Sequence, residues 1–520
     1  MKNYLRLTNI FLFLFLLIFF AAITKIYYER VGSFSFGDEW NNFTAAFFML
    51  KGRMLYSHIF YNHQVLPVYI SYLIQRLFHP KTMYALVLYH RMFIVLFSFT
   101  MDLFLIFRFK KNGILFVLFY ESTKFYLFGN LFLAESLIVQ PVVYMFGIAW
   151  EKIQKIRISR LDLILSAVFC WFIVFTREPY VPLVVILYGT ILFEKNIHRI
   201  NKYSIGVFIL LCALMIIPLY KSFYDYFFQV IVFNLTITLS RQIVGQGAGI
   251  DLAKVFFYPI LIFFDGKWNY FRNILIELDS IFLLLLFVFT LFLKRIKETF
   301  FVLFILGLAG IRFIPPGVVF YDAFHMLQWW GVFIFGIILL IAELHKNKKF
   351  ETFHHFLLCS VCLILIYTIF SSGSFIWEKV NKQEEFTRNY AHYYINAEVI
   401  RLLSNPKNTL FADQWDYFIH WHANLDSSYE YAIYSFTTKG YERYRIAREN
   451  MFRTNPPDFY YTFCAKNEFF SKLLPKDSFK DYAQLYRDSR PSCLYVRSAI
   501  LSGINKSQWM EAKKIGFSLQ

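Results

Sequence analysis

Long apolar segments separated by short basic loops constrain this chain more than any other feature. Apolar runs of about 18 residues are long enough to cross the hydrocarbon core of a bilayer as helices. Only 17% of the residues are charged, against about 25% in soluble proteins. The sequence therefore predicts a polytopic α-helical membrane protein with about 11 transmembrane helices. The predicted spans are 8–27, 83–107, 113–129, 131–150, 161–176, 178–194, 204–220, 275–293, 299–313, 322–343 and 353–372.

The charges of the loops predict how these helices are oriented. Lys2 and Arg6 precede the first apolar run and no convincing cleavage site follows it, so we expect a retained helix with a cytoplasmic N-terminus. Basic residues then recur in every second loop, as expected for loops on the inner face. With an odd number of spans, the C-terminus lies outside. The predicted location is the plasma (cytoplasmic) membrane, crossed many times.

Net charge and cysteine content exclude other classes of protein. The charge of +18 is explained by orientation in the membrane and by attraction to anionic headgroups of the lipid bilayer. No basic stripe with a recognition fold is present, so no nucleic-acid partner is expected. The six cysteines show no zinc-site spacing. Cys464 and Cys493 lie in the polar C-terminal region and would be able to pair in an extracytoplasmic domain.

Composition divides the chain into two domains. Residues 1–373 form the transmembrane domain, and residues 374–520 are charged and contain no predicted span. The second domain is predicted to be a soluble extracytoplasmic α/β domain of ordinary size. We expect a helix over Glu384–Leu403 and buried strands at Thr409–Ala412 and Cys493–Val496.

Two long outer loops interrupt the transmembrane domain, at residues 28–82 and 221–274. In the first, Asn41–Leu50 is predicted to form a short amphipathic helix that ends near Gly52. Leu66–Phe78 is apolar but short for a span, so we expect it to lie along the membrane surface. In the second loop, Val255–Phe264 is typical of a re-entrant or interfacial segment.

The first outer loop carries an acidic pair, Gly37-Asp38-Glu39-Trp40. Carboxylates at the edge of a bilayer are costly to desolvate and often serve a function in a water-filled cavity. The alternative is an interfacial loop whose acids only face water. Two further short motifs follow in this loop, Gly52-Arg53-Met54-Leu55-Tyr56 and His63-Gln64-Val65-Leu66-Pro67.

This layout resembles the GT-C glycosyltransferases, in particular the branch with the protein O-mannosyltransferases and the aminoarabinose transferase of lipid A. The resemblance covers residues 1 to about 372 and consists of the layout and a few short motifs. It implies a polyprenyl-phosphate sugar donor, an inverting transfer and a first-loop acid that acts as the base. On this sequence that acid is Asp38, with Glu39 as the alternative or a helper. The acceptor, whether lipid, glycan or protein, is not specified.

The residue types agree with this chemistry. A carboxylate opposite the leaving group can take the acceptor's proton, and a leaving phosphate needs cationic or hydrogen-bonding partners. The candidates for substrate binding are His63, Lys124, Glu135, Arg177, Arg312, Tyr321 and His325.

Each candidate also has a structural alternative. Arg177 would equally pair with Glu178 or reach lipid headgroups. Arg312 and His325 would anchor the interface beside Trp329-Trp330. An internal salt bridge between Lys124 and Glu135, and a hydrogen-bonded structural role for His63, also remain open.

Metal chemistry and other functions are the remaining alternatives. Asp38, Glu39 and His63 show no ligand spacing, so no metal or cofactor is predicted, although metal dependence stays open. The alternative function is a transporter or flippase of lipid-linked saccharides, a class that often shows inverted repeats and broken helices. Neither feature is found in the sequence. A non-catalytic scaffold would leave the acidic pair without a purpose.

Overall fold

The computed structural model divides into two compact units. The described residues are 2–192, 200–236, 256–264, 270–312, 320–371, 379–413, 416–433, 438, 440–462 and 480–519. What we call the helical unit comprises Met1–Arg30, Arg91–Pro218 and Thr238–Val380. What we call the mixed unit comprises Val31–His90, Leu219–Ile237 and Asn381–Gln520.

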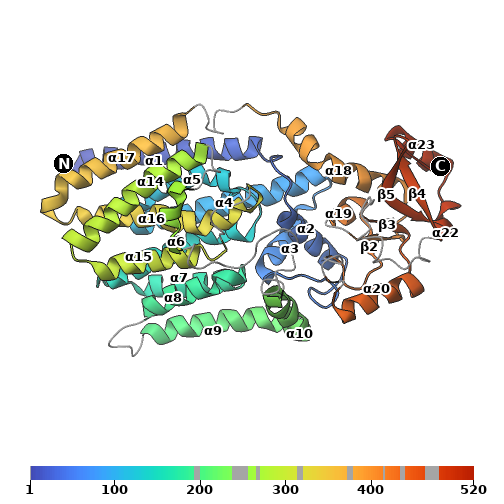
Figure 1. The fold of residues 1–520 in the computed structure, drawn as a ribbon, viewed down its shortest axis with the longest axis horizontal. Helices are drawn as coiled ribbons and strands as arrows, with labels where there is room; N and C mark the ends of the chain where they lie inside the picture. Colours follow the sequence, from blue (N-terminus) through green and yellow to red (C-terminus); the bar gives the residue numbers. More distant parts are fainter. Residues whose placement is uncertain are drawn as a thin grey trace. The chain divides into compact units, whose positions relative to one another are not determined.

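Each predicted span overlaps a helix over the residues that the structure describes (Figure 1). These helices are α1 (Lys2–Glu29), α4 (Met83–Phe109), α5 (Lys111–Thr123), α6 (Ala134–Ile153), α7 (Arg160–Val174), α8 (Val181–Leu192), α9 (Ile200–Leu219), α14 (Tyr270–Phe287), α15 (Ile296–Ala309), α16 (Leu327–Leu344) and α17 (Glu351–Phe370). Among the described residues, 6 helical stretches are long and apolar enough to cross a membrane. They are Ile10–Glu29, Met83–Phe109, Lys202–Thr236, Asn273–Phe292, Ala323–Leu344 and Lys348–Phe370. The helical class is confirmed, and the number of eleven spans stays a prediction.

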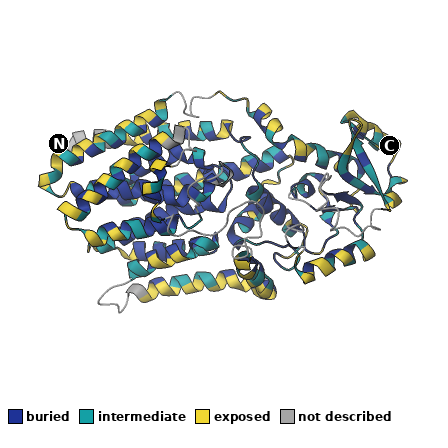
Figure 2. Cartoon of the chain, in the orientation of Figure 1, coloured by how far each residue is buried: buried dark blue, intermediate teal, exposed yellow. Residues whose placement is uncertain are grey.

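Helix α16 forms the centre of the helical unit. It packs against α5, α6, α14, α15 and α17, and Figure 2 shows it in dark blue along its length. A Cβ atom on Gly331 would lie 2.5 Å from Cγ1 of Val139. The close approach of α16 to α6 therefore requires glycine at this position, as at many helix contacts in membranes.

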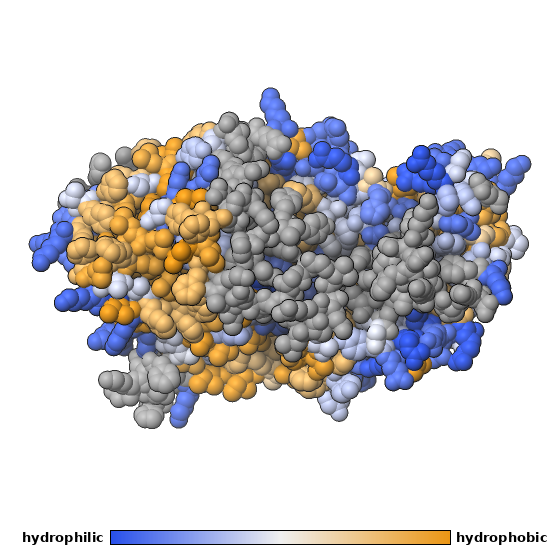
Figure 3. All heavy atoms as spheres, in the orientation of Figure 1, coloured by the Kyte–Doolittle hydropathy of each residue, from blue (hydrophilic) through white to orange (hydrophobic). Residues whose placement is uncertain are grey.

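The outward faces of the helical unit are apolar. Figure 3 shows hydrophobic residues gathered over its helices, and Leu96, Phe107 and Leu161 are among the exposed ones. In water this surface would be unfavourable, whereas lipid tails solvate it at no cost. The unit is therefore built for a bilayer.

The mixed unit contains a six-stranded sheet in the order β2-β1-β3-β5-β4-β6. Strand β1 is parallel to β2 and β3, and the remaining neighbours are antiparallel. The strands are β1 (Thr409–Ala412), β2 (Asp426–Ser427), β3 (Phe459–Tyr461), β4 (Tyr482–Arg487), β5 (Arg490–Arg497) and β6 (Phe517–Leu519). The helices of this part are α18 (Lys382–Leu403), α19 (Ile419–Ala423), α20 (Glu442–Thr454), α22 (Ser498–Leu501) and α23 (Lys506–Lys514). The predicted helix and both predicted strands are thus present.

The first outer loop belongs to the same compact unit as this sheet. It forms α2 (Gly37–Leu50) and α3 (Val65–Phe78), and α2 begins four residues before the predicted start. Gly52, with φ of 90°, follows the end of α2 in a backbone conformation that favours glycine. The sequence-based division at residues 373 and 374 separated this loop from the C-terminal part, whereas in the structure the two pack together.

The guanidinium of Arg53 ties the loop to the C-terminal part of the mixed unit. It pairs with Asp426 at 2.8 Å and donates to the Tyr429 carbonyl at 2.8 Å. It also donates to the carbonyls of Ser427 and Glu430. One arginine thereby donates hydrogen bonds to three backbone carbonyl oxygens of the segment that begins in β2.

Candidate active site

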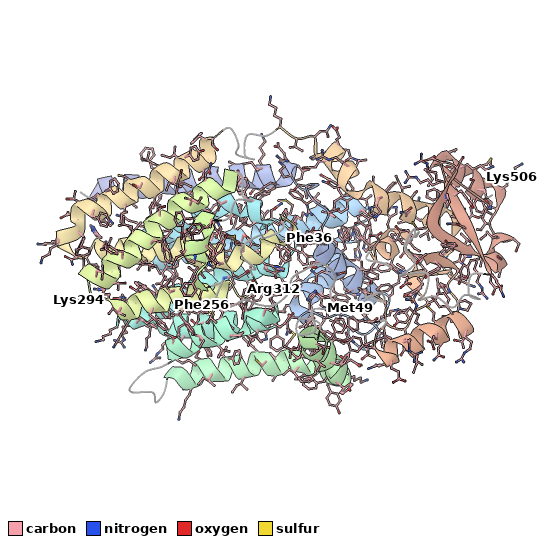
Figure 4. The ribbon with its side chains drawn as sticks, viewed as in Figure 1. Phe36, Met49, Phe256, Lys294, Arg312 and Lys506 are labelled. Atoms are coloured by element: carbon pink, nitrogen blue, oxygen red, sulfur yellow. The ribbon has the colours of Figure 1, made fainter. Side chains whose placement is uncertain are left out.

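Asp38 and Glu39 occupy the first turn of α2 in the mixed unit. Figure 4 labels Phe36, directly before the helix, and Met49 near its end. The Glu39 side chain is fully buried, whereas Asp38 is partly exposed. The positive end of the helix dipole favours negative charge at both positions. Of the two acids, Asp38 is therefore the one that solvent reaches, and its role as the base stays a prediction.

A hydrogen-bonded chain supports the turn that carries Asp38. The side-chain amide of Asn42 donates to the Asp38 carbonyl oxygen at 3.0 Å. The Tyr61 hydroxyl in turn donates to Oδ1 of Asn42. On the other side of α2, Trp40 packs edge-on against Tyr393, with ring centroids 4.3 Å apart. The turn is therefore fixed by both polar and aromatic contacts.

His63 lies in the same unit but is a partly exposed member of the loop between α2 and α3. Its carbonyl accepts a hydrogen bond from the Tyr56 hydroxyl at 2.8 Å. Its ring meets the Tyr61 ring edge-on at 5.6 Å. These contacts agree with a structural role, and substrate binding by His63 stays a prediction.

The helical unit brings three other candidates together around one carboxylate. Glu135 in the first turn of α6 accepts from Nε of Arg177 at 2.7 Å and from a terminal nitrogen of Arg312 at 3.1 Å. Arg177 directly precedes the short helix η2 (Glu178–Tyr180), and Arg312 follows α15 (Figure 4). The Glu135 and Arg177 side chains are buried, while Arg312 keeps 23% exposure. Arg177 thus pairs with Glu135, a partner that was not among the alternatives considered for it.

Two guanidinium groups on one carboxylate form a cluster suited to anions. Each guanidinium carries five N–H donors in a planar fork, which matches the oxygens of a phosphate. The cluster is further held by Gln328 of α16, whose Nε2 donates to the Glu135 carbonyl at 2.7 Å. Nearby, the Tyr180 hydroxyl donates to the His325 carbonyl at 3.4 Å.

His325 lies in the short helix η7 (Phe320–Met326) and packs on the neighbouring Phe324 ring. Its Nε2 is buried and has no hydrogen-bond partner among the described residues. Tyr321 belongs to the same short helix, but its side chain lies outside the described ones. The structure therefore brings His325 near Tyr180 and leaves Tyr321 untested.

Lys124 pairs with Glu121 and not with Glu135, the partner considered from the sequence. It begins the short helix η1 (Lys124–Leu127), and its Nζ contacts Oε1 of Glu121 at 2.7 Å, with neither side chain exposed. The ammonium group also lies over the rings of Tyr27 and Tyr120, at 5.2 and 5.7 Å. The interpretation of a Lys124–Glu135 salt bridge was wrong, because Glu121 lies in the last turn of α5, only three residues before Lys124, and is reached more directly.

The opposite end of α6 carries a second arginine cluster. Arg108 pairs with Glu151 and donates from Nε to Asp162 at 2.8 Å. Glu151 follows Glu135 by sixteen residues, which places the two clusters about 24 Å apart along the helix. This second cluster lies at loops predicted to face the cytoplasm and offers a matched control for the first.

No metal-binding cluster of three or more His, Cys, Asp or Glu residues is found in the described parts of the chain. Cys493 is disulfide-bonded, and Cys464 lies outside the described residues. The four cysteines of the helical unit are free thiols, as expected for fillers of apolar segments.

Comparison with known proteins shows which solved structure has a similar fold. No protein-family model matches the sequence, and no curated protein matches it either. The structure is similar to the crystal structure of ArnT from Cupriavidus metallidurans in the apo state, with a TM-score of 0.53. The match covers 93% of this chain and 98% of that chain at 9% sequence identity. This chain has an ArnT-like fold.

The ArnT-like fold confirms the resemblance to the GT-C glycosyltransferases at the level of the fold. It extends beyond residue 372, where the sequence resemblance ended, because 93% of the chain is covered. At 9% identity the match shows the fold alone, so the roles of individual residues rest on the geometry of this chain.

Several residues that support these two regions were missed in the sequence. Gln328, Asn42, Tyr61 and Gln229 are neutral side chains within apolar or mixed stretches, and no motif marks them. Their buried hydrogen bonds depend on segments far apart in the chain. The one usable signal was that a polar side chain buried among apolar residues needs a partner.

Proposed function

We propose that this chain is an integral membrane glycosyltransferase that moves a sugar from a polyprenyl-phosphate donor to an acceptor on the extracytoplasmic face. The acceptor is a lipid, a glycan or a protein, and the transfer inverts the anomeric carbon. The observation that carries the proposal is the partly exposed Asp38 in the first turn of α2, the helix that follows the first apolar helix in the sequence, in an ArnT-like fold.

In the proposed step, the acceptor oxygen forms a bond to the anomeric carbon as the bond from that carbon to the phosphate oxygen breaks. The polyprenyl phosphate leaves with the bonding electron pair, and Asp38 takes the acceptor's proton. Within the helical unit, the Arg177 and Arg312 guanidinium groups are the candidate partners of a phosphate, whose charge they would balance. Lys124 is not assigned to it, because Lys124 and Glu121 are both 0% exposed, whereas the Glu135 cluster reaches the surface through Arg312, which is 23% exposed.

Two observations support the outer location of the mixed unit. Basic residues are concentrated in the alternate loops that would face the cytoplasm. A disulfide at Cys493 is typical of an oxidising, extracytoplasmic compartment. With eleven spans and an inner N-terminus, the C-terminal sheet lies on the same outer side as α2.

The test uses the full chain in liposomes, with a radiolabelled panel of polyprenyl-phosphate sugars and lipid, glycan and peptide acceptors. Asp38→Asn should lower transfer about 100-fold or more, since a general base contributes at least this much. Glu39→Gln should retain more activity when it folds, because Glu39 is buried. Wild-type activity in Asp38→Asn would reject the base. Movement of label across the membrane without a glycosylated product would favour the transporter or flippase.

A further inference from the structure

The segment that follows α9 contains a widened helical turn in the mixed unit. It runs through η3 (Tyr220–Ser222) and α10 (Phe223–Phe227) into the π-helix η4 (Phe228–Phe233). Such π-turns are rare and are found frequently at functional sites. Here the turn carries Gln229, a neutral amide that is fully buried.

The Gln229 side chain bridges two backbone groups of the first outer loop. Its Oε1 accepts from the Tyr61 backbone N–H at 2.8 Å, and its Nε2 donates to the Tyr56 carbonyl at 2.8 Å. A single amide therefore satisfies a donor and an acceptor five residues apart in that loop. Replacing it with an apolar side chain would leave both groups buried and unpaired.

Asn234 makes a second, reciprocal contact to the same loop. Its Nδ2 donates to the Asn62 carbonyl at 2.6 Å, and Nδ2 of Asn62 donates to its Oδ1 at 2.9 Å. In a regular α-helix, residues five apart point about 140° away from each other. The i to i+5 geometry of the π-helix reduces that angle, which explains how Gln229 and Asn234 reach one loop.

We call the contacts of Gln229 and Asn234 with the first outer loop the clamp. Further hydrogen bonds connect this clamp to the turn that carries Asp38. Tyr61, whose backbone is held by Gln229, donates its hydroxyl to Asn42, and Asn42 donates to the Asp38 carbonyl at 3.0 Å. Asn42 is 4% exposed and Gln229 0%, so water does not compete strongly for these bonds. These hydrogen bonds therefore connect the segment that follows α9 with the first turn of α2.

We infer that Gln229 is a positioning residue for Asp38 and acts through Tyr61 and Asn42. The inference rests on the proposed function, in which Asp38 is the base. Gln229 does not touch the substrate in this role; it holds the first turn of α2 in the orientation that proton transfer requires. Small misplacements of catalytic groups are sufficient to lower rates strongly.

The test compares Tyr61→Phe with Tyr482→Phe in the full chain. Tyr61→Phe removes only the hydroxyl that joins the loop to Asn42. Tyr482→Phe removes a hydroxyl that donates to the Pro457 carbonyl at 2.6 Å, in the sheet of the same unit. We expect Tyr61→Phe to lower kcat about tenfold with KM within about twofold, and Tyr482→Phe to leave both unchanged.

A readout without activity separates this inference from the proposed function. Hydrogen exchange of the amides at residues 38–42 should speed up in Tyr61→Phe and in Gln229→Leu, and not in Tyr482→Phe. Unchanged exchange in Tyr61→Phe would overturn the clamp, even where Gln229→Leu does not fold. Faster exchange in Tyr61→Phe, combined with full activity of the Asp38→Asn variant, would support the clamp and reject Asp38 as the base.

Discussion

Nζ of Lys124 lies 2.7 Å from Oε1 of Glu121, and both side chains are entirely enclosed in the helical unit. A pair of this kind is strongly destabilising to break from one side, because the remaining charge is buried alone. Its enclosure, together with the rings of Tyr27 and Tyr120, makes Lys124 a member of the core of the helical unit.

Lys124→Met should therefore lower the free energy of unfolding by about 3–5 kcal/mol, and the double variant with Glu121→Gln should recover most of the loss. Thermal unfolding of the detergent-purified chain measures both. A Lys124→Met protein that unfolds like the wild type but no longer binds a polyprenyl-phosphate sugar would return Lys124 to the set of phosphate ligands.

If the arginines of the Glu135 cluster bind the donor phosphate, replacing either one should lower kcat/KM. Arg177→Ala and Arg312→Ala should each lower kcat/KM about 10- to 100-fold, since a hydrogen bond to a charged group contributes about 1.5–3 kcal/mol. Arg177→Lys should not restore activity, because lysine lacks the planar fork of donors. Steady-state kinetics with varied donor concentration measures these effects.

Arg108→Ala is the control for that prediction. It breaks an arginine cluster of the same kind at the other end of α6. Its effect should appear in stability and expression, with kcat/KM per folded molecule near the wild-type value. Equal losses of kcat/KM in Arg108→Ala and Arg177→Ala would show that both clusters are merely structural.

Arg53 and Asp426 are expected to differ in importance although they form one ion pair. Arg53 is 17% exposed and also holds three backbone carbonyls, whereas Asp426 is 45% exposed. Arg53→Ala should therefore lower the free energy of unfolding by about 2–3 kcal/mol, and Asp426→Asn by less than about 1 kcal/mol. Thermal unfolding of the two variants side by side measures this, and equal losses would contradict it.

The helices were predictable because length and hydrophobicity alone determine a membrane-spanning segment. All eleven predicted spans overlap helices, and six helical stretches of the described residues are long and apolar enough to cross a membrane. The strand at Thr409–Ala412 matches β1 residue for residue. The start of α2 was missed, since its N-cap is Phe36, without a capping side chain to mark it.

Partnerships between distant residues were less predictable. Sequence separation says nothing about which acid meets which base, so Glu135 was paired with Lys124 although it meets Arg177 and Arg312. The Lys124–Glu121 pair did have a signal, namely the spacing of three residues on one helix. The contacts of Gln229 had none, because its backbone partners are 168 and 173 residues away and its third partner, the Tyr444 hydroxyl, is 215 residues away.

The buried His420 of α19 should make the free energy of unfolding depend on pH. Burial lowers the pKa of its imidazole to about 4, and its Nδ1 lies 3.2 Å from the Leu425 carbonyl, which suits the neutral ring with a proton on Nδ1. The ring also packs edge-on against Phe48 of α2. Its protonation would therefore disturb the contact between α19 and α2.

Between pH 6.5 and about 4, the unfolded chain binds a proton at His420 and the folded chain does not. The free energy of unfolding should therefore fall as the pH is lowered through this window, by about 3 kcal/mol in total, and stay unaffected by this group above pH 6.5. Thermal unfolding midpoints measured from pH 7.5 to 4.5 check the prediction. His420→Gln should be less stable at neutral pH but show a shallower decline on acidification, since glutamine does not titrate. A decline as steep as that of the wild type would assign the acid sensitivity to other groups.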